Sequence, residues 1–181
     1  MTTSRIALVT GGARGIGEAI CRVLAARGLR VVVSDVNAEG ARALAAQIGG
    51  YGIGLDVTKP GSVTSAVAEI NQEVGPPWLL VNNAGWDNLM PFLETDEAFQ
   101  EKVIAINYAG PVRICRAVLP GMIGQGSGRI VNIASDAGRI GSALEAIYSG
   151  TKGGLIAFTK TLAREFRSEE RRVGKECRLL C

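Results

Sequence analysis

Short apolar runs alternate along this chain with longer segments in which apolar residues recur at helical spacing. The apolar runs span residues 6–10, 30–35, 52–55, 78–81 and 129–134. The segments of helical period span residues 18–27, 38–48, 62–74, 96–122 and 146–165. A strand followed by a helix, repeated along a chain, is typical of β-α-β units. The pattern therefore predicts one parallel sheet of five strands with helices on both faces.

The predicted strands are apolar throughout rather than at alternate positions. Residues 31–33 read Val-Val-Val, and residues 79–81 read Leu-Leu-Val. Strands buried on both faces have this composition, whereas a strand with one wet face alternates apolar and polar residues. Because crossovers between parallel strands are right-handed, these units are expected to build a doubly wound α/β sheet of the Rossmann type. The expected strand order is 3-2-1-4-5.

Length and composition narrow the possible classes of protein. The 181 residues, 47% of them hydrophobic, suffice for one substantial core, and we expect a single domain over residues 1–166. A formal net charge of +3 does not favour a nucleic-acid surface. We expect neither a signal peptide nor a membrane span, because no stretch approaches the roughly 20 apolar residues that a span needs. A cytoplasmic protein is therefore expected.

Residue usage also argues against two common kinds of active site. The chain has no histidine, and it has four cysteines, Cys21, Cys115, Cys177 and Cys181, without a Cys-x-x-Cys pair. A Ser-His-Asp triad needs histidine, and zinc sites are built mainly from cysteine and histidine. We expect no metal site.

A glycine-rich turn directly follows the first predicted strand. Residues 10–17 read Thr-Gly-Gly-Ala-Arg-Gly-Ile-Gly, and an alanine-rich helix is predicted next. The N–H groups and the dipole at a helix start attract an anion, and glycine lets the backbone approach it closely. The order of strand, turn and helix is that of a pyrophosphate site, although a turn used only for packing looks the same. The candidate cofactor contacts in this turn are Gly11, Ala13, Arg14, Gly15, Ile16 and Gly17.

One acid, Asp35, ends the second predicted strand, about twenty residues beyond the turn. A carboxylate there can accept hydrogen bonds from both adenosine-ribose hydroxyls, and it repels a 2′-phosphate. Arg14 acts in the opposite direction, because its guanidinium can pair with a 2′-phosphate. The charge of Asp35 would still lie at the same place, so NAD(H) is the expected cofactor and NADP(H) the alternative.

Tyr148 and Lys152 lie four residues apart in the last predicted helix and therefore on one helix face. Tyrosine titrates near pH 10, so acid–base work near neutrality needs a pKa lower by about 2 to 3. A cation about 4 Å away is worth roughly 4 kcal/mol at an effective dielectric near 20, which is enough. Ser135, at the end of the fifth predicted strand, can hold a substrate oxygen for Tyr148. In many helices the same spacing marks only a packed tyrosine beside a solvated lysine.

Taken together, residues 1–166 resemble the short-chain dehydrogenase/reductase family. The resemblance rests on motifs in the family's order, namely the glycine turn, Asp35, Asp56-Val57, Asn82-Asn83-Ala84-Gly85, Asn107, Ser135, Tyr148 and Lys152. It implies an NAD(P)-dependent oxidoreductase that acts on CH–OH groups. It also implies a small-molecule substrate and a homo-oligomeric intact protein.

The resemblance assigns four residues to catalysis. It implies that Tyr148 is the general acid and base, and that Lys152 lowers the pKa of Tyr148 and binds the nicotinamide ribose. Ser135 is expected to orient the substrate, and Asn107 to hold a water of the proton relay. A purely structural role for Asn107 stays open, because asparagine within a helix can bond to its own backbone and kink the helix.

The resemblance assigns a second set of residues to the cofactor. Asp56 and Val57, after the third predicted strand, are expected to contact the adenine. Asn83, Ala84 and Gly85, after the fourth, are expected to line the path of the cofactor. Tyr148 and Lys152 belong to this set as well as to the catalytic one.

Within the family, residues 85–87 and 135–148 look similar to 2-hydroxycyclohexanecarboxyl-CoA dehydrogenases and, more loosely, to 3-oxoacyl-acyl-carrier-protein reductases. The expected substrate is therefore a secondary alcohol or ketone of the hydroxyacyl thioester type, cyclic or open. Trp86, Asp136 and Glu145 are candidate substrate contacts, with local packing or a helix-dipole role as the alternative.

After the helix that holds Lys152, the chain departs from the family. Family members continue with a sixth strand, a substrate lid and a seventh strand, so the sheet is expected to lack these two strands and to end at an exposed edge. Residues 167–181 resemble a sequencing-adapter segment translated in frame, and we expect a non-native tail there, with a genuine charged helix end as the alternative. The assigned activity is accordingly that of the intact parent, and the fragment itself is expected to be inactive or prone to aggregate.

Two other classes of function remain open at this stage. A catalytically inactive nucleotide-binding protein of the same fold would keep the glycine turn and Asp35. An interaction module that uses an exposed edge strand would need no cofactor. The presence of all four catalytic residues, Asn107, Ser135, Tyr148 and Lys152, favours the enzyme.

Overall fold

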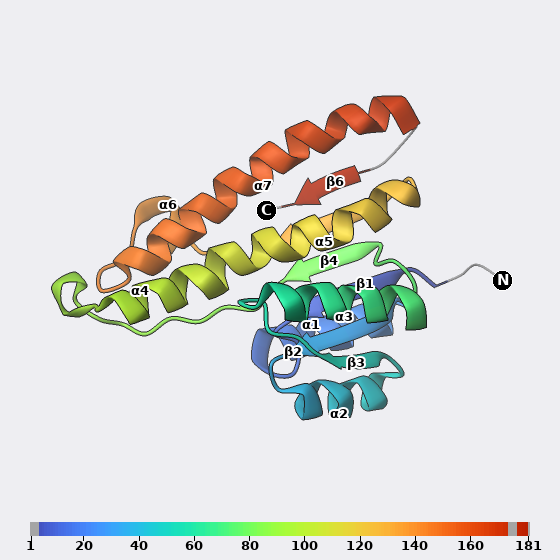
Figure 1. The fold of residues 1–181 in the computed structure, drawn as a ribbon, viewed down its shortest axis with the longest axis horizontal. Helices are drawn as coiled ribbons and strands as arrows, with labels where there is room; N and C mark the ends of the chain where they lie inside the picture. The colour runs from blue at the N-terminus through green and yellow to red at the C-terminus, as the bar shows by residue number, and fades with distance from the viewer. Residues whose placement is uncertain (1–3, 174–176, 181) are drawn as a thin grey trace.

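The computed structural model describes residues 4–173 and 177–180. Its centre is a six-stranded parallel sheet in the order β3-β2-β1-β4-β5-β6 (Figure 1). The strands are β1 (Ile6–Thr10), β2 (Arg30–Asp35), β3 (Tyr51–Gly54), β4 (Leu79–Asn82), β5 (Gly128–Asn132) and β6 (Cys177–Leu180). The first five strands have the predicted order 3-2-1-4-5, and the doubly wound α/β fold is confirmed.

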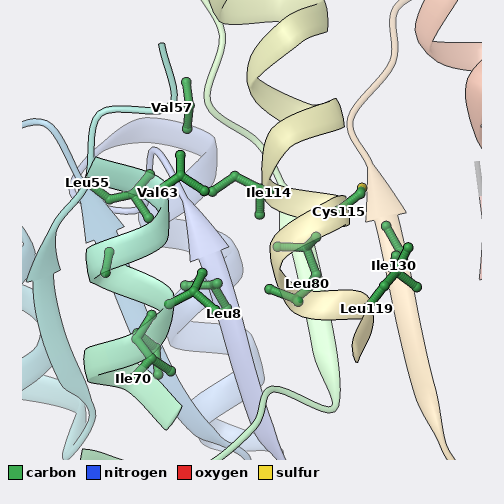
Figure 2. Packing of buried hydrophobic residues seen from close by; sticks show 14 of the residues in the cluster. Leu8, Leu55, Val57, Val63, Ile70, Leu80, Ile114, Cys115, Leu119 and Ile130 are labelled. Atoms are coloured by element: carbon green, nitrogen blue, oxygen red, sulfur yellow. The ribbon is translucent and has the colours of Figure 1, made fainter. Parts of the chain in front are cut away.

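Helices cover both faces of the sheet. One face packs against α1 (Gly15–Ala26) and α2 (Ala38–Ile48), and the other against α3 (Pro60–Glu73), α5 (Gly110–Gly124) and α7 (Ala146–Val173). The buried residues form two clusters, a first one on the face covered by α1 and α2 and a second one on the face covered by α3, α5 and α7. Successive strand residues point to opposite faces, so Leu8 of β1 lies in the second cluster, and Ala7 and Val9 lie in the first. Figure 2 shows the second cluster, in which strand residues meet helix residues, among them Leu8, Leu80, Ile130, Val63, Ile70, Ile114 and Leu119.

The register of the central strands brings their carboxyl ends to one edge. Thr10 at the end of β1 pairs with Ser34 of β2, and Asn82 at the end of β4 pairs with Asn132 of β5. The loops that follow these strands therefore open together on the same side of the sheet. In open parallel sheets this edge is where ligands bind.

Helix α1 begins at Gly15, three residues before the predicted start at Glu18. The N–H of Glu18 already donates to the carbonyl oxygen of Arg14 at 3.2 Å. The glycine turn is therefore itself the first turn of α1, and the free N–H groups of the helix start lie within it.

The segment predicted as one helix over residues 96–122 contains a defect. It consists of α4 (Glu97–Ile104), a π-helical turn η2 (Ala105–Ala109) and α5. The structure also has two one-turn helices that the sequence analysis did not predict, η1 (Phe92–Glu94) and α6 (Ala137–Ile140). Elements this short carry no recognisable hydrophobic period.

The expectation that the sheet ends at β5 needs correction. β6 pairs in parallel with β5, from Gly128 opposite Cys177 to Val131 opposite Leu180. The reason is geometric: α7 continues to Val173 rather than ending near residue 165, and residues 177–180 lie along the outer edge of β5. That edge offers main-chain N–H and C=O groups, with which any short extended segment can pair. The proposal that residues 167–181 are a non-native tail stays a prediction.

Among the helices in the described part of the chain, none is long and apolar enough to cross a lipid bilayer. Within the same residues, no three or more cysteine or acidic side chains gather in a way that could hold a metal ion.

Candidate active site

The glycine turn after β1 has a backbone that only glycine adopts without strain. Gly11 and Gly15 have φ angles of +63° and +56°. A Cβ on Gly11 would lie 2.8 Å from the Cα of Ala84, and a Cβ on Gly17 would collide with the carbonyl oxygen of Gly11. Glycine at 11 and 17 therefore lets the turn, the start of α1 and the loop after β4 touch one another.

Asp35 is anchored to this turn through the main chain. Its Oδ2 accepts a hydrogen bond of 3.1 Å from the N–H of Ala13, and its Oδ1 accepts one of 2.9 Å from the N–H of Asn37. The carboxylate is therefore fixed beside the glycine turn, as expected for a group that would bind a ribose. Arg14, the residue with the opposite preference, is exposed.

A cleft of about 430 Å³ runs along the carboxyl edge of the sheet, and its volume is in the range of about 300–1,000 Å³ usual for small-molecule sites. Most of the predicted cofactor contacts line it: Gly11, Arg14, Gly15, Ile16, Gly17, Asp35, Asp56, Val57, Asn83, Ala84 and Gly85. Trp86 lines it as well. Four further lining residues were not predicted, although each adjoins a predicted one: Val36, Leu55, Thr58 and Ile106.

The loop after β3 forms the far wall of this cleft. Oδ1 of Asp56 accepts hydrogen bonds from the hydroxyl of Thr58 at 2.6 Å and from its N–H at 2.9 Å. The hydroxyl bond is the main reason why the pKa of Asp56 is lowered, and the nearby ammonium of Lys59 acts in the same direction. The carbonyl oxygen of Val57 accepts a hydrogen bond of 3.3 Å from Arg113 of α5. Hydrogen bonds therefore hold this loop both internally and to α5.

Asn83 joins the ends of β1 and β4 beneath the cleft. Its Nδ2 donates to the carbonyl oxygens of Thr10 and Gly11 at 3.1 and 2.9 Å. The hydroxyl of Thr10 in turn accepts from the N–H groups of Asn83 and Ala84, each at 3.1 Å. Thr10 was not predicted as a site residue, since its role depends on contacts across the sheet.

A buried polar network supports the other end of the site. Nδ2 of Asn82 donates to Oδ1 of Asn132 at 2.8 Å, and Nδ2 of Asn132 donates to the hydroxyl of Thr159 at 2.8 Å. The network links β4, β5 and α7. It therefore fixes α7, and Tyr148 and Lys152 with it, relative to the sheet.

The structure brings Ser135, Tyr148 and Lys152 together. Tyr148 lies in the first turn of α7, and its phenol is hydrogen-bonded to the Ser135 side chain at the end of the β5 loop. Nζ of Lys152, one turn further along α7, lies 5.4 Å from the centre of the Tyr148 ring. It donates a hydrogen bond of 2.8 Å to the carbonyl oxygen of Ile133.

The electrostatics of this group differ from the expectation that Lys152 lowers the pKa of Tyr148. In the protein alone the pKa of Tyr148 is raised, first by burial and then by the charges of Glu145 and Asp87, while the hydrogen bond to Ser135 lowers it. Burial lowers the pKa of Lys152 itself. The hydrogen bond of the ammonium goes to the carbonyl oxygen of Ile133. That Lys152 lowers the pKa of Tyr148 stays a prediction.

Asn107 lies within the π-helical turn η2 and is fully buried. Its Nδ2 donates to the carbonyl oxygens of Trp86 and Val103 at 2.6 and 2.9 Å, and its Oδ1 accepts from the N–H of Trp86 at 3.2 Å. The structural role considered for Asn107 is therefore present. A place in a proton relay stays a prediction.

Gly85 connects the cleft with the catalytic group. It lines the cleft, and a Cβ on it would lie 3.1 Å from Oδ1 of Asn107 and 4.0 Å from Nζ of Lys152. One end of the cleft therefore reaches the residues that surround Tyr148. Of the other candidate substrate contacts, Glu145 lies beside Tyr148, whereas Asp136 is an exposed residue at the start of α6.

A dinucleotide would fit the groups that this cleft presents. Backbone N–H groups at a helix start meet a pyrophosphate, the anchored carboxylate of Asp35 meets a ribose, and glycine leaves room along the path between them.

Comparison with known proteins agrees with this geometry. A family model described as "short chain dehydrogenase" matches residues 5–175. The 3-oxoacyl-[acyl-carrier-protein] reductase of Escherichia coli (strain K12) is 41% identical over 168 residues, which cover 91% of this chain and 68% of the relative. A sorbitol dehydrogenase of Cereibacter sphaeroides is 41% identical over 160 residues, which cover 87% of this chain and 62% of the relative.

Solved structures give the same picture. A short-chain dehydrogenase from Streptomyces avermitilis superposes with a TM-score of 0.89 and 33% identity, over 93% of this chain and 62% of that one. A structure titled ribose-5-phosphate isomerase, from Brucella melitensis 16M, has a TM-score of 0.87 and 36% identity, over 92% of this chain and 65% of that one. The chain thus spans about two thirds of the length of the proteins it matches.

Proposed function

Since this chain belongs to the short-chain dehydrogenase family, we propose that it carries the NAD(H)-binding and catalytic part of an enzyme that interconverts a ketone and a secondary alcohol. The observation that carries the proposal is the junction at Gly85, where the cleft meets Asn107 and Lys152 and hence the surroundings of Tyr148. A packing-only glycine turn would not need a buried lysine, with a tyrosine and a serine near it, next to a glycine that lines the same cleft.

The position of Asp35 supports NAD(H) over NADP(H). Its carboxylate is held by the N–H groups of Ala13 and Asn37, so it cannot easily swing away from a 2′-phosphate. The carboxylate of Asp35 and the 2′-phosphate of a bound NADP(H) would repel each other, and this cost is absent for NAD(H). Arg14 is exposed and would have to overcome this fixed charge.

Bound NAD(H) supplies the hydride chemistry. In ketone reduction, Ser135 donates a hydrogen bond to the substrate oxygen, and the O–H bond of Tyr148 breaks as its proton moves to that oxygen. The phenolate then recovers a proton from water, directly or through a relay at Asn107. Alcohol oxidation runs these proton transfers in reverse. Lys152 keeps a positive charge one helical turn from the phenol, where it can also meet the nicotinamide ribose.

Apolar side chains around Tyr148 support an acyl substrate. Phe92 and Leu144 line a small pocket together with Tyr148, and both are largely exposed. Leu93, which follows Phe92 in η1, and Leu89, shortly before it, are exposed to 94% and 64%. An apolar rim of this kind suits the chain or ring of a hydroxyacyl thioester better than a polyol. The name of the E. coli relative, a 3-oxoacyl reductase, points to the same class.

The alternative is a catalytically inactive nucleotide-binding protein. The raised pKa of Tyr148 is the observation that favours it, because a phenol that holds its proton tightly is a poor base for alcohol oxidation. The same phenol can still serve as the acid in ketone reduction, and the enzyme is therefore the proposal we retain. A homo-oligomeric intact enzyme is proposed with it.

Titration of the 181-residue chain with NADH tests the proposal. Trp86 lines the cleft, so its emission is expected to fall on binding, and a Trp78→Phe background leaves Trp86 as the single tryptophan. In the intact parent enzyme, a short 3-oxoacyl thioester is then expected to cause NADH consumption, and Tyr148→Phe to stop it. Absence of saturable NADH binding would remove the proposal, and an intact parent that binds NADH but turns over no ketone would favour the inactive alternative.

A further inference from the structure

Two acidic side chains from separate parts of the chain meet beside Tyr148. Asp87 lies in the loop after β4, and Glu145 directly precedes α7. Both side chains line the small pocket that Tyr148 also lines. The two loops are tied together by a bond of 3.0 Å from the N–H of Met90 to the carbonyl oxygen of Leu144.

The position of Glu145 is costly to maintain. Leu144, the residue before it, has a φ of +66°, which makes it the one described non-glycine residue in the left-handed region. A branched side chain disfavours this conformation, and strain of this kind is commonly held at functional sites. The N–H of Glu145 donates to the carbonyl oxygen of Ser142, and its own carbonyl oxygen accepts from Ser149 at 2.7 Å. The main chain of Glu145 is therefore held on both sides.

Asp87 is also held in an unfavourable setting. Its Oδ2 is buried and makes no hydrogen bond within the described residues. Burial raises the pKa of Asp87, and the charge of Glu145 raises it further, while the N–H of Asn88 lowers it. Neither the strain at Leu144 nor the buried carboxyl oxygen contributes to the core. Both occur at the pocket where Asp87 and Glu145 lie beside Tyr148.

We propose that Asp87 and Glu145 are positioning residues, which place negative charge beside the Tyr148 hydroxyl and so favour the protonated phenol that donates a proton to a ketone. The role assigned to that phenol rests on the proposed function. Opposing groups face the phenol as well, because Ser135 is bonded to it and the ammonium of Lys152 lies one helical turn away. The balance among these groups decides the pH above which Tyr148 can act as a base.

The direction of the effect follows from charge alone. An ordinary tyrosine ionises well above the range in which ordinary carboxyl groups do, so a carboxylate beside a phenol opposes the loss of the phenol's proton. Removal of either charge stabilises the phenolate and lowers the titration midpoint of Tyr148. In turnover, the acidic limb of alcohol oxidation then moves to lower pH, and the alkaline limit of ketone reduction moves down with it.

An NMR titration of the 181-residue chain with ¹³Cζ-labelled tyrosine tests this proposal without the need for turnover. The chain has three tyrosines, and loss of a signal in Tyr148→Phe identifies Tyr148. Glu145→Gln and Asp87→Asn are each expected to lower its midpoint. Tyr51 is the internal reference, because Glu69 accepts a hydrogen bond of 2.7 Å from its hydroxyl and raises its pKa.

Glu69→Gln is the matched control, in which the Tyr51 midpoint is expected to fall while that of Tyr148 stays. An unchanged Tyr51 midpoint in the Asp87 and Glu145 variants shows that they remain folded. If Tyr148 then titrates as in the unsubstituted chain, the positioning role is disproved. A lowered Tyr148 midpoint, together with an intact parent that turns over no ketone, would support the positioning role and count against the proposed enzyme, so the two failures are distinguishable.

Discussion

The cofactor cleft at the glycine turn is built from main-chain geometry, whereas the substrate side around Tyr148 is built from charged and apolar side chains on separate loops. In the cleft, left-handed glycines and backbone N–H groups fix the turn and the carboxylate of Asp35. Around Tyr148, the Ser135 hydroxyl, two acids and an apolar rim determine the chemistry.

This difference means that binding and chemistry can be separated by substitution. Changes in the cleft act through the space that the backbone occupies, so they are expected to weaken cofactor binding first. Changes around Tyr148 alter proton affinity and substrate contact, and they leave the backbone of the cleft intact. The Asn82–Asn132–Thr159 network is the structural link between the two sides.

The largest expected effect is on turnover, and it comes from a substitution on the substrate side, around Tyr148. Tyr148→Phe removes the proton donor, and general acid–base catalysis of this kind is worth roughly 10²- to 10⁴-fold. We expect kcat to fall by about 10³-fold with the Kd for NADH unchanged. The measurement is steady-state ketone reduction beside a fluorescence titration with NADH. A parallel loss of NADH binding would show that the two sides are not separable.

The largest expected effect on NADH binding comes from a substitution in the cofactor cleft. In Gly17→Ala the new Cβ collides with the carbonyl oxygen of Gly11, so the turn must shift away from its anion-binding shape. Overpacking of this kind costs about 1–3 kcal/mol, and we expect NADH to bind roughly 10- to 100-fold more weakly. Gly150→Ala, on α7 with nothing within 4 Å of its Cβ position, is the control that should leave binding unchanged. Equal loss in both variants would contradict the backbone argument.

A smaller effect is expected on cofactor choice. Asp35→Ser removes the fixed charge but keeps an oxygen that the N–H of Ala13 can reach. We expect NADPH to bind about tenfold more tightly than to the unsubstituted chain, because Arg14 no longer competes with a nearby carboxylate. NADH is expected to weaken by a few-fold through the loss of ribose hydrogen bonds. The comparison is a pair of titrations, and an NADPH affinity that does not rise would mean that Asp35 does not set the preference.

The cofactor cleft at the glycine turn could be predicted from the sequence more completely than the substrate side around Tyr148. Apolar runs located the first five strands, and the family resemblance is confirmed by the match over residues 5–175 and by relatives named as dehydrogenases and reductases. The glycine turn was recognisable because glycine is needed where a Cβ has no room, as at Gly11 and Gly17. A requirement of this kind is visible in the residue type itself.

The features that were not predicted depend on distances across the fold. The raised pKa of Tyr148 follows from its burial and from Asp87, a residue 61 positions away in a different loop. The sixth strand depends on where α7 ends. The hydrogen bonds that the Thr10 hydroxyl accepts depend on which strand lies next to β1. No local spacing in the sequence carries this information.

The smallest predicted effect lies at the far wall of the cleft, where side chains again take part. Thr58→Val removes the hydroxyl that donates to Asp56, so the pKa of Asp56 should return toward its ordinary value of 3.8. A lowered carboxyl pKa contributes stability that is present above 3.8 and is lost as pH falls through the lowered value. The free energy of unfolding should therefore fall by less than about 1 kcal/mol near neutral pH and by almost nothing in strong acid.

Urea unfolding at the two pH values measures this difference, and Lys59→Ala is the control. The Lys59 side chain is 76% exposed and its Nζ lies 3.5 Å from Asp56, so its removal should change stability by even less. A Thr58→Val deficit that persists in strong acid would mean that the hydroxyl acts through packing rather than through the ionised carboxylate. In that case the shape of the loop after β3 would not depend on charge, as is expected also for the backbone of the glycine turn.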